Sequence, residues 1–145
     1  MLAGLSILIA EDEELVALDL AYTVKDLGGL VIGPAATVGE ALMLLETHHA
    51  AAAILDGCLL DRDVTPLARQ LADHGVPFVI HTGSGLPAEL AASHPSLPVV
   101  MKPVSPMVVM RALLRQIGSS NAPSHPVPMA PLAYEATSRA PSRWR

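Results

Sequence analysis

The sequence is poor in cysteine, in aromatic residues and in basic residues. Cys58 is the one cysteine among 145 residues, which excludes an internal disulfide framework and a zinc site built from several cysteines. Aromatic residues make up 3% of the chain, so a core must come mostly from Ala, Leu and Val. The net charge is −5, which argues against a nucleic-acid binder because such proteins normally carry a basic patch.

The sequence also lacks a long uninterrupted hydrophobic run. The longest uncharged segment, residues 116–134, contains four prolines and cannot form a membrane span. The first residues have no basic segment and soon reach Glu11, so we expect no secretory signal. The hydrophobic fraction of 51% excludes wholesale disorder, and the length corresponds to one domain. We therefore expect a cytoplasmic domain with a sizeable core.

The composition changes near Gly118. Residues 118–145 are rich in proline and serine and show no helical or alternating apolar period. We expect a structured domain over residues 1–117 and a flexible Pro- and Ser-rich tail over residues 118–145. Trp144 could anchor a docking arm, but a solvated tail without a partner is the simpler interpretation.

The first 117 residues alternate between two kinds of segment. Five short apolar runs bounded by Gly, Pro or acids are typical of strands buried on both faces: Leu5–Ala10, Leu30–Ile32, Ala52–Leu55, Pro77–Ile80 and Pro98–Met101. Segments with helical spacing or start signals lie between and after them: Glu13–Leu27, a helix after a Thr37–Glu40 capping box, Leu67–His74 after a Thr65 cap, Pro87–Ser93 and Met107–Ile117. The pattern predicts an α/β fold with a parallel sheet and helices on both faces.

Polar side chains follow four of the five predicted strands. Glu11 and Asp12 come after the first strand, Asp56 after the third, Thr82 after the fourth and Lys102 after the fifth. Because ligand sites of such sheets lie beyond the carboxyl ends of the strands, we expect these side chains to lie together.

This set of residues predicts a magnesium-dependent phosphoryl site. Three neighbouring carboxylates would repel one another unless a divalent cation neutralised them. Mg²⁺ suits the site because it prefers oxygen ligands and keeps waters that a phosphoryl oxygen can replace. An aspartate carboxylate can act as a nucleophile toward phosphorus, and Lys102 and Thr82 can stabilise the transferring phosphoryl oxygens.

The ordered set of motifs resembles the receiver domain of two-component response regulators. The matching segments are residues 7–12, 54–56, 80–83 and 101–103, and the resemblance extends over residues 5–117. Residues 77–83 also resemble the Pro-Phe-x-x-x-Thr-Gly fourth strand of a subgroup of stand-alone receivers often called FATGUY. The resemblance implies a flavodoxin-like (βα)5 doubly wound sandwich with a five-stranded parallel sheet.

The resemblance also implies a role for each site residue. Asp56 would be the phosphoacceptor, Asp12 a direct Mg²⁺ ligand, and Glu11 a residue that acts on the metal mostly through water. The backbone carbonyl of Cys58 would be a further metal ligand. Lys102 would bridge Asp56 and the phosphoryl group, in a cis Lys102–Pro103 peptide. Thr82 would move toward the phosphoryl group after transfer.

Two positions depart from the usual family residues. Glu11 stands where Asp is frequent, and Val99 stands where many members have an aromatic switch residue. These departures favour an alternative, a receiver-like adaptor that binds protein partners without phosphorylation. A small phosphatase of similar topology is disfavoured because it needs Asp-x-Asp after the first strand, and this chain has Glu11-Asp12-Glu13.

Three features have simpler interpretations than a role in chemistry. Strand alternation directs His81 away from the Thr82 side, so we interpret it as structural. Cys58 is interpreted as a packed loop side chain rather than a redox thiol. The last predicted helix is broadly apolar, and it is either an ordinary buried helix or, in part, a homodimer interface.

We therefore predict a single-domain response regulator. A sensor histidine kinase or a phosphotransfer protein would supply the phosphoryl group to Asp56 with Mg²⁺ as cofactor. No DNA-binding or catalytic output domain fits in the tail, so output would be contact with a downstream protein partner or passage of the group along a phosphorelay. The protein would be a phosphoacceptor that resets by hydrolysis of its own acyl phosphate, not an enzyme in the usual sense, with no nucleic-acid or membrane partner.

Overall fold

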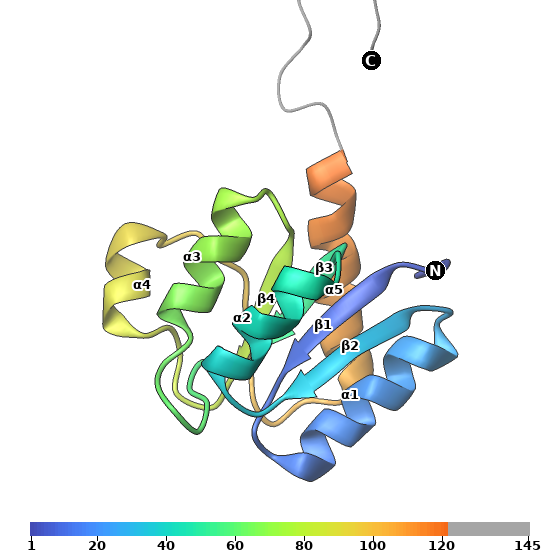
Figure 1. The fold of residues 1–145 in the computed structure, drawn as a ribbon, viewed down its shortest axis with the longest axis horizontal. Coiled ribbons are helices and arrows are strands. Elements are labelled where there is room, and N and C mark those ends of the chain that lie inside the picture. The colour runs from blue at the N-terminus through green and yellow to red at the C-terminus, as the bar shows by residue number, and fades with distance from the viewer. Residues whose placement is uncertain (122–145) are drawn as a thin grey trace, which may run out of the picture.

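Strands and helices alternate strictly along residues 1–121, the part of the chain that the computed structural model describes (Figure 1). In chain order the elements are β1 Ser6–Ala10, α1 Glu14–Asp26, β2 Leu30–Ala35, α2 Val38–Thr47, β3 Ala52–Leu55, α3 Thr65–Asp73, β4 Phe78–Thr82, α4 Ala88–Ser93, β5 Val99–Met101 and α5 Pro106–Asn121. Helix α5 runs past Ile117, its expected end. The rest of the expected tail, residues 122–145, lies outside the described residues.

The strands form one parallel sheet in the order β2-β1-β3-β4-β5. This order confirms the predicted five-stranded parallel sheet and the flavodoxin-like fold. The chain reverses its direction of winding between β2 and β3, so β1 and β3 are central neighbours and their carboxyl ends lie side by side. In doubly wound sheets, this position is where ligands bind.

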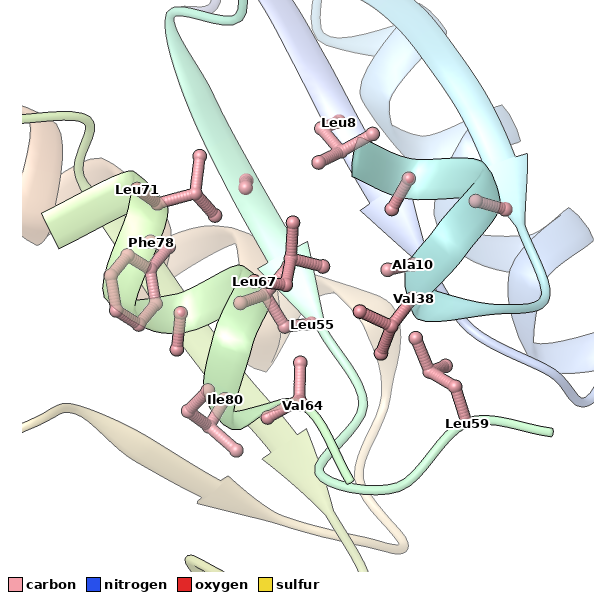
Figure 2. Packing of buried hydrophobic residues seen from close by; sticks show 14 of the residues in the cluster. Leu8, Ala10, Val38, Leu55, Leu59, Val64, Leu67, Leu71, Phe78 and Ile80 are labelled. Carbon is pink, nitrogen blue, oxygen red and sulfur yellow. The ribbon is translucent and has the colours of Figure 1, made fainter. Parts of the chain in front are cut away.

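Helices cover both faces of the sheet (Figure 1), and a layer of hydrophobic side chains lies between the helices and the sheet on each face. Leu8, Leu55 and Ile80 face the layer covered by α2, α3 and α4, and Figure 2 shows their packing with Leu67 and Leu71 of α3. Strand residues whose side chains point to the other face of the sheet, such as Ile7 and Ile54, form the second layer together with buried side chains of α1 and α5. Aliphatic side chains and alanines therefore fill the core almost alone, as the scarcity of aromatic residues requires. Within residues 1–121, no helix combines the length and the apolar character that a membrane crossing needs.

Strand β2 is longer than predicted. We expected the strand to end at Ile32 because Gly33-Pro34 is typical of a turn, and this prediction was wrong. In the structure, Gly33 has a φ of +96°, and a Cβ there would lie 2.9 Å from the carbonyl oxygen of Ile9. The strand continues to Ala35 across this irregularity. Pro34 is tolerated because β2 is an edge strand, whose outer side needs no donor.

The predicted start of α3 was also wrong in one respect. Thr65 does not cap the helix: it lies inside the first turn, and its hydroxyl has no hydrogen-bond partner. The carboxylate of Asp63 accepts the Thr65 N–H at 2.9 Å instead. The predicted cap of α2 is confirmed, because Thr37 Oγ1 accepts the Glu40 N–H at 2.9 Å.

Candidate functional site

The carboxyl ends of the central strands bring the predicted carboxylates together. Glu11 and Asp12 follow β1 directly, and Asp56 follows β3. One oxygen from each of the three lies within 4.8 Å of the others. Glu11 and Asp56 are buried, at 3% and 8% exposure, and Asp12 is half-buried. Three acidic groups are thus held at the sheet edge with little water to screen them.

Lys102 reaches this cluster from the end of β5. Its Nζ lies 3.0 Å from Glu11 Oε1 and 3.2 Å from Asp56 Oδ2. The Lys102–Pro103 peptide is cis, which confirms the expectation for this bond. The expected proximity of Lys102 and Asp56 is therefore present in the structure.

Lys102 also contacts Glu13, a residue for which no role in the site was predicted. Nζ lies 3.3 Å from Glu13 Oε1, on a largely exposed side chain. The backbone N–H of Glu13 donates to Glu11 Oε2 at 3.1 Å. The position of Glu13 next to Glu11 and Asp12 in the sequence was a signal for a role in the site. Whether its side chain turns toward Lys102 depends on the tertiary structure.

The charges of the cluster shift two pKa values. Burial and, to a lesser extent, the neighbouring Asp56 together raise the pKa of Glu11 to about 7, although the Glu13 N–H and Lys102 lower it. Burial alone would lower the pKa of Lys102, but hydrogen bonds and charges from Glu11 and Asp56 hold it above its ordinary value. Burial therefore disfavours the ionised form of Glu11, whereas the two carboxylates favour the charged form of Lys102.

Thr82 lies at the end of β4, fully buried beside the residue that follows Asp56. A Cβ on Gly57 would lie 2.8 Å from Thr82 Oγ1, so only glycine allows this close approach without a shift. Thr82 Oγ1 accepts the Ser84 N–H at 3.2 Å. The placement of Thr82 near Asp56 was predictable from the strand ends, whereas the need for glycine at position 57 depends on the packed structure.

Cys58 differs from its expected environment. Its side chain is exposed, so the prediction of a packed loop residue was wrong. The backbone turns around Asp56 instead: the Cys58 N–H donates to Asp56 Oδ1 at the long distance of 3.5 Å. The role of the Cys58 carbonyl as a metal ligand stays a prediction.

His81 lies on the opposite side of β4 from Thr82, toward α1 and α5. It is 4% exposed, and neither ring nitrogen has a hydrogen-bond partner. Burial lowers the pKa of His81, and the charge of Lys102 lowers it further. It borders a cavity of about 220 Å³ with Glu13, Asp19 and Lys102, but it is not part of the carboxylate cluster.

The donor set fits a hard divalent cation. Carboxylate oxygens are the ligands that Mg²⁺ prefers. Three acidic side chains share this site with the ammonium of Lys102, so a divalent cation can balance the remaining negative charge. Among residues 1–121, no other group of three potential ligands lies so close together.

Comparison with known proteins places the fold and the site in context. No protein-family model matches the sequence, and no curated protein matches it. The chain is 34% identical to SdrG from Sphingomonas melonis, with 79% of this chain and 99% of SdrG covered and a TM-score of 0.64. It is 31% identical to the response regulator PhyR from Brucella abortus, with 79% and 47% of the two chains covered and a TM-score of 0.64.

A further structure carries a metal ion. This is the receiver domain of a sensor histidine kinase from Pseudomonas aeruginosa, with a magnesium ion coordinated in its active-site cleft. Identity is 23%, coverage is 80% of this chain and 99% of the other, and the TM-score is 0.67. At this identity the likeness shows the shared fold.

Proposed function

The chain belongs to the receiver-domain family of response regulators, and on this basis we propose that it accepts a phosphoryl group on Asp56 in a Mg²⁺-dependent reaction. A sensor histidine kinase or a phosphotransfer protein would be the donor. The observation that carries the proposal is the approach of the Lys102 ammonium to Asp56 within a cluster of three carboxylates. A carboxylate buried only for stability would gain nothing from two acidic neighbours.

The chemistry of Asp56 follows from this geometry. A carboxylate oxygen attacks the phosphorus of the donor phosphohistidine, and the phosphorus–nitrogen bond breaks. The imidazole nitrogen keeps the electron pair and takes a proton from solvent, while Asp56 becomes an acyl phosphate. Lys102 pairs with the phosphoryl oxygens, and the Thr82 hydroxyl donates to one of them. Hydrolysis returns the carboxylate and inorganic phosphate.

The cation would be held by Glu11, Asp12 and Asp56, with the Cys58 carbonyl as a further ligand. When bound, it neutralises charge on the phosphoryl oxygens and draws the nucleophile and the donor group together. Lys102 would then exchange part of its contact with Glu11 for contact with the phosphoryl group.

Exposed apolar side chains beside the site support the proposal that protein partners bind there. On α1, Leu15, Leu18 and Tyr22 are 78%, 47% and 58% exposed and follow one another at helical spacing. We propose that this stripe receives the phosphodonor, because it starts next to Glu13 at the mouth of the site.

A second exposed apolar group lies on the other side of the site. Val99 and Met101 on β5, Val104 in the loop after it and Val108 at the start of α5 are each more than a third exposed. We propose this surface for the downstream partner or a homodimer. This surface and the sequence of residues 77–83 support the proposal of a single-domain regulator of the FATGUY type. Such a regulator would signal by protein contact or within a phosphorelay.

The test of the proposal is phosphorylation by a small donor. Incubation with phosphoramidate and Mg²⁺ should add one phosphoryl group, seen by intact-protein mass spectrometry, and EDTA should prevent it. Asp56→Asn removes the nucleophile at nearly constant volume and should stay unmodified. Asp63→Asn, in the same loop but hydrogen-bonded to α3, is the matched control and should be modified. A wild type that stays unmodified would favour the phosphorylation-independent adaptor.

A further inference from the structure

The side chain of Asp61 joins the loop after Asp56 to the start of α2. Its Oδ1 accepts the Val38 N–H at 2.8 Å, and its Oδ2 accepts the Gly39 N–H at 3.1 Å. Both donors are in the first turn of α2, far from Asp61 in the chain. The hydrogen bond from Val38 lowers the pKa of Asp61, so the carboxylate is ionised and matches the positive end of the helix.

Helix α2 already has a local cap. Thr37 Oγ1 accepts the Glu40 N–H, and Glu40 Oε1 accepts the Ala36 N–H at 3.2 Å. Asp61 takes the two remaining N–H groups of the first turn. Gly39 is exposed, so water could serve its N–H and a helix start alone would not require a side chain from elsewhere there; Val38 is buried, and the Asp61 carboxylate serves its N–H.

The same junction touches both halves of the acidic site. The Ala36 carbonyl accepts the Leu60 N–H at 3.1 Å, next to Asp61. The neighbouring Ala35 carbonyl accepts the Glu11 N–H at 2.9 Å. The turn between β2 and α2 is therefore hydrogen-bonded to the segment that carries Glu11 and to the loop that follows Asp56.

Backbone hydrogen bonds hold the two ends of the loop together. Gly57 O accepts the Val64 N–H at 3.0 Å, and Cys58 pairs with Asp63 in an antiparallel bridge. The Leu59 side chain is buried, and Figure 2 shows it reaching from the loop toward Val38 of α2. A displacement of Asp61 would therefore change the position of the Cys58 backbone.

We propose that Asp61 is a positioning residue of the phosphoacceptor site. Its carboxylate fixes the loop after Asp56 against α2, and this sets where the Cys58 backbone stands relative to Glu11 and Asp12. Asp61 contacts neither the donor nor the metal; it acts through the loop. The inference rests on the proposed function, because the property it controls is Mg²⁺ binding at that site.

The experiment compares Asp61→Ala with Thr37→Ala. Asp61→Ala removes two hydrogen bonds to the first turn of α2 and Thr37→Ala removes one, but only Asp61→Ala frees the loop. Isothermal titration with Mg²⁺ should show an affinity about 10-fold weaker for Asp61→Ala, as for other residues that orient metal ligands, and near wild type for Thr37→Ala. Asp61→Asn keeps an oxygen acceptor for Val38 and should recover part of the affinity. The Cys58 amide resonance should shift in Asp61→Ala before any Mg²⁺ is added.

Two outcomes would overturn the proposal: wild-type Mg²⁺ affinity in Asp61→Ala, or equal weakening in both variants, which would make Asp61 a helix cap only. If Asp61→Ala fails to fold, Asp61→Asn and Asp61→Ser against Thr37→Ala decide by the same criterion. In either outcome the wild type still binds Mg²⁺ and accepts the phosphoryl group. A wild type that binds no Mg²⁺ refutes the proposed function and this inference with it.

Discussion

At the scale of single residues, the site is defined by an imbalance of charge. Lys102 contacts three carboxylates, those of Glu11, Glu13 and Asp56. Burial and the neighbouring Asp56 raise the pKa of Glu11, and one ammonium does not offset these two effects. The site can therefore bind a second cation. The Lys102 ammonium can then shift its contacts toward the group with the most negative charge.

Replacement of Lys102 tests this second role. Lys102→Ala should still allow Mg²⁺-dependent modification of Asp56, because the carboxylates remain. The spread of amide shifts that beryllofluoride induces toward α4 and β5 in the wild type should shrink, because the group that links the phosphoryl site to β5 is gone. Lys25→Ala on α1 is the control, and NMR spectroscopy measures both. A wild-type shift pattern in Lys102→Ala would contradict this role.

His81 gives a pH-dependent prediction. Its pKa in the folded protein is lowered from 6.5 by burial and by Lys102, although Asp56 and Glu13 oppose the change. The unfolded chain therefore takes up a proton first as the pH falls below about 6.5, and the native state loses stability over that range.

His81→Leu should remove this acid-dependent loss. At pH 7 the variant should also be more stable by about 1 kcal/mol, because two buried nitrogens without partners are replaced by carbon. Urea denaturation at several pH values measures both effects, with the exposed His49→Gln as the control. A parallel pH profile for wild type and His81→Leu would show that His81 is not the group responsible.

At the scale of elements, α1 separates two apolar stripes that look alike in the sequence. Leu20 and Val24 are buried against the sheet, whereas Leu15, Leu18 and Tyr22 are exposed. Both stripes have helical spacing, so periodicity alone could not tell which one faces the core.

This difference predicts opposite consequences for two leucine substitutions. Leu20→Ala should cost about 3 kcal/mol of unfolding free energy, as for other buried leucines. Leu18→Ala should change stability by less than about 0.5 kcal/mol, which is usual for surface sites, and should instead weaken phosphoryl transfer from a kinase that uses α1. Chemical denaturation measures the first effect. A large loss of stability in Leu18→Ala would mean that this stripe is structural.

Elements could be predicted from the sequence where the signal was local. The Thr37 cap, the central strands β1 and β3 and the end of α1 near Leu27 depend on neighbouring residues, and the structure has each of them. Strand β2 was predicted too short because Gly33-Pro34 is compatible with a turn and with an edge-strand irregularity. The start of α3 depends on Asp63 rather than on Thr65. Both residue types are good helix caps, so the sequence alone could not decide between them.

At the scale of the whole molecule, parallel topology explains why the site could be predicted at all. Residues at the carboxyl ends of different strands must meet at one edge, so Glu11, Asp12, Asp56, Thr82 and Lys102 were identified together. Glu13 was missed because a residue before α1 can equally well point into solvent, and Asp61 was missed because its contact joins a loop to α2 and not two strand ends. Such contacts require the packed structure.

Mg²⁺ should stabilise the whole domain. A ligand that binds the folded state and not the unfolded chain raises unfolding free energy, by about 2.7 kcal/mol at 100 times its dissociation constant. The melting temperature should therefore rise with MgCl₂ and return with EDTA, and NaCl at equal ionic strength should not reproduce the rise. Asp12→Asn should lose most of the effect. An equal response to both salts would mean that no specific cation site is present.

The most direct measurement identifies the residue that carries the phosphoryl group. After treatment with phosphoramidate and Mg²⁺, borohydride reduction converts an aspartyl phosphate into homoserine, and peptide mass spectrometry locates it. The structure predicts homoserine at position 56, dependent on Mg²⁺ and absent in the Asp56→Asn protein. Reduction at any other carboxylate, or no homoserine anywhere in the chain, would contradict the assignment of this acidic cluster as a phosphoacceptor site.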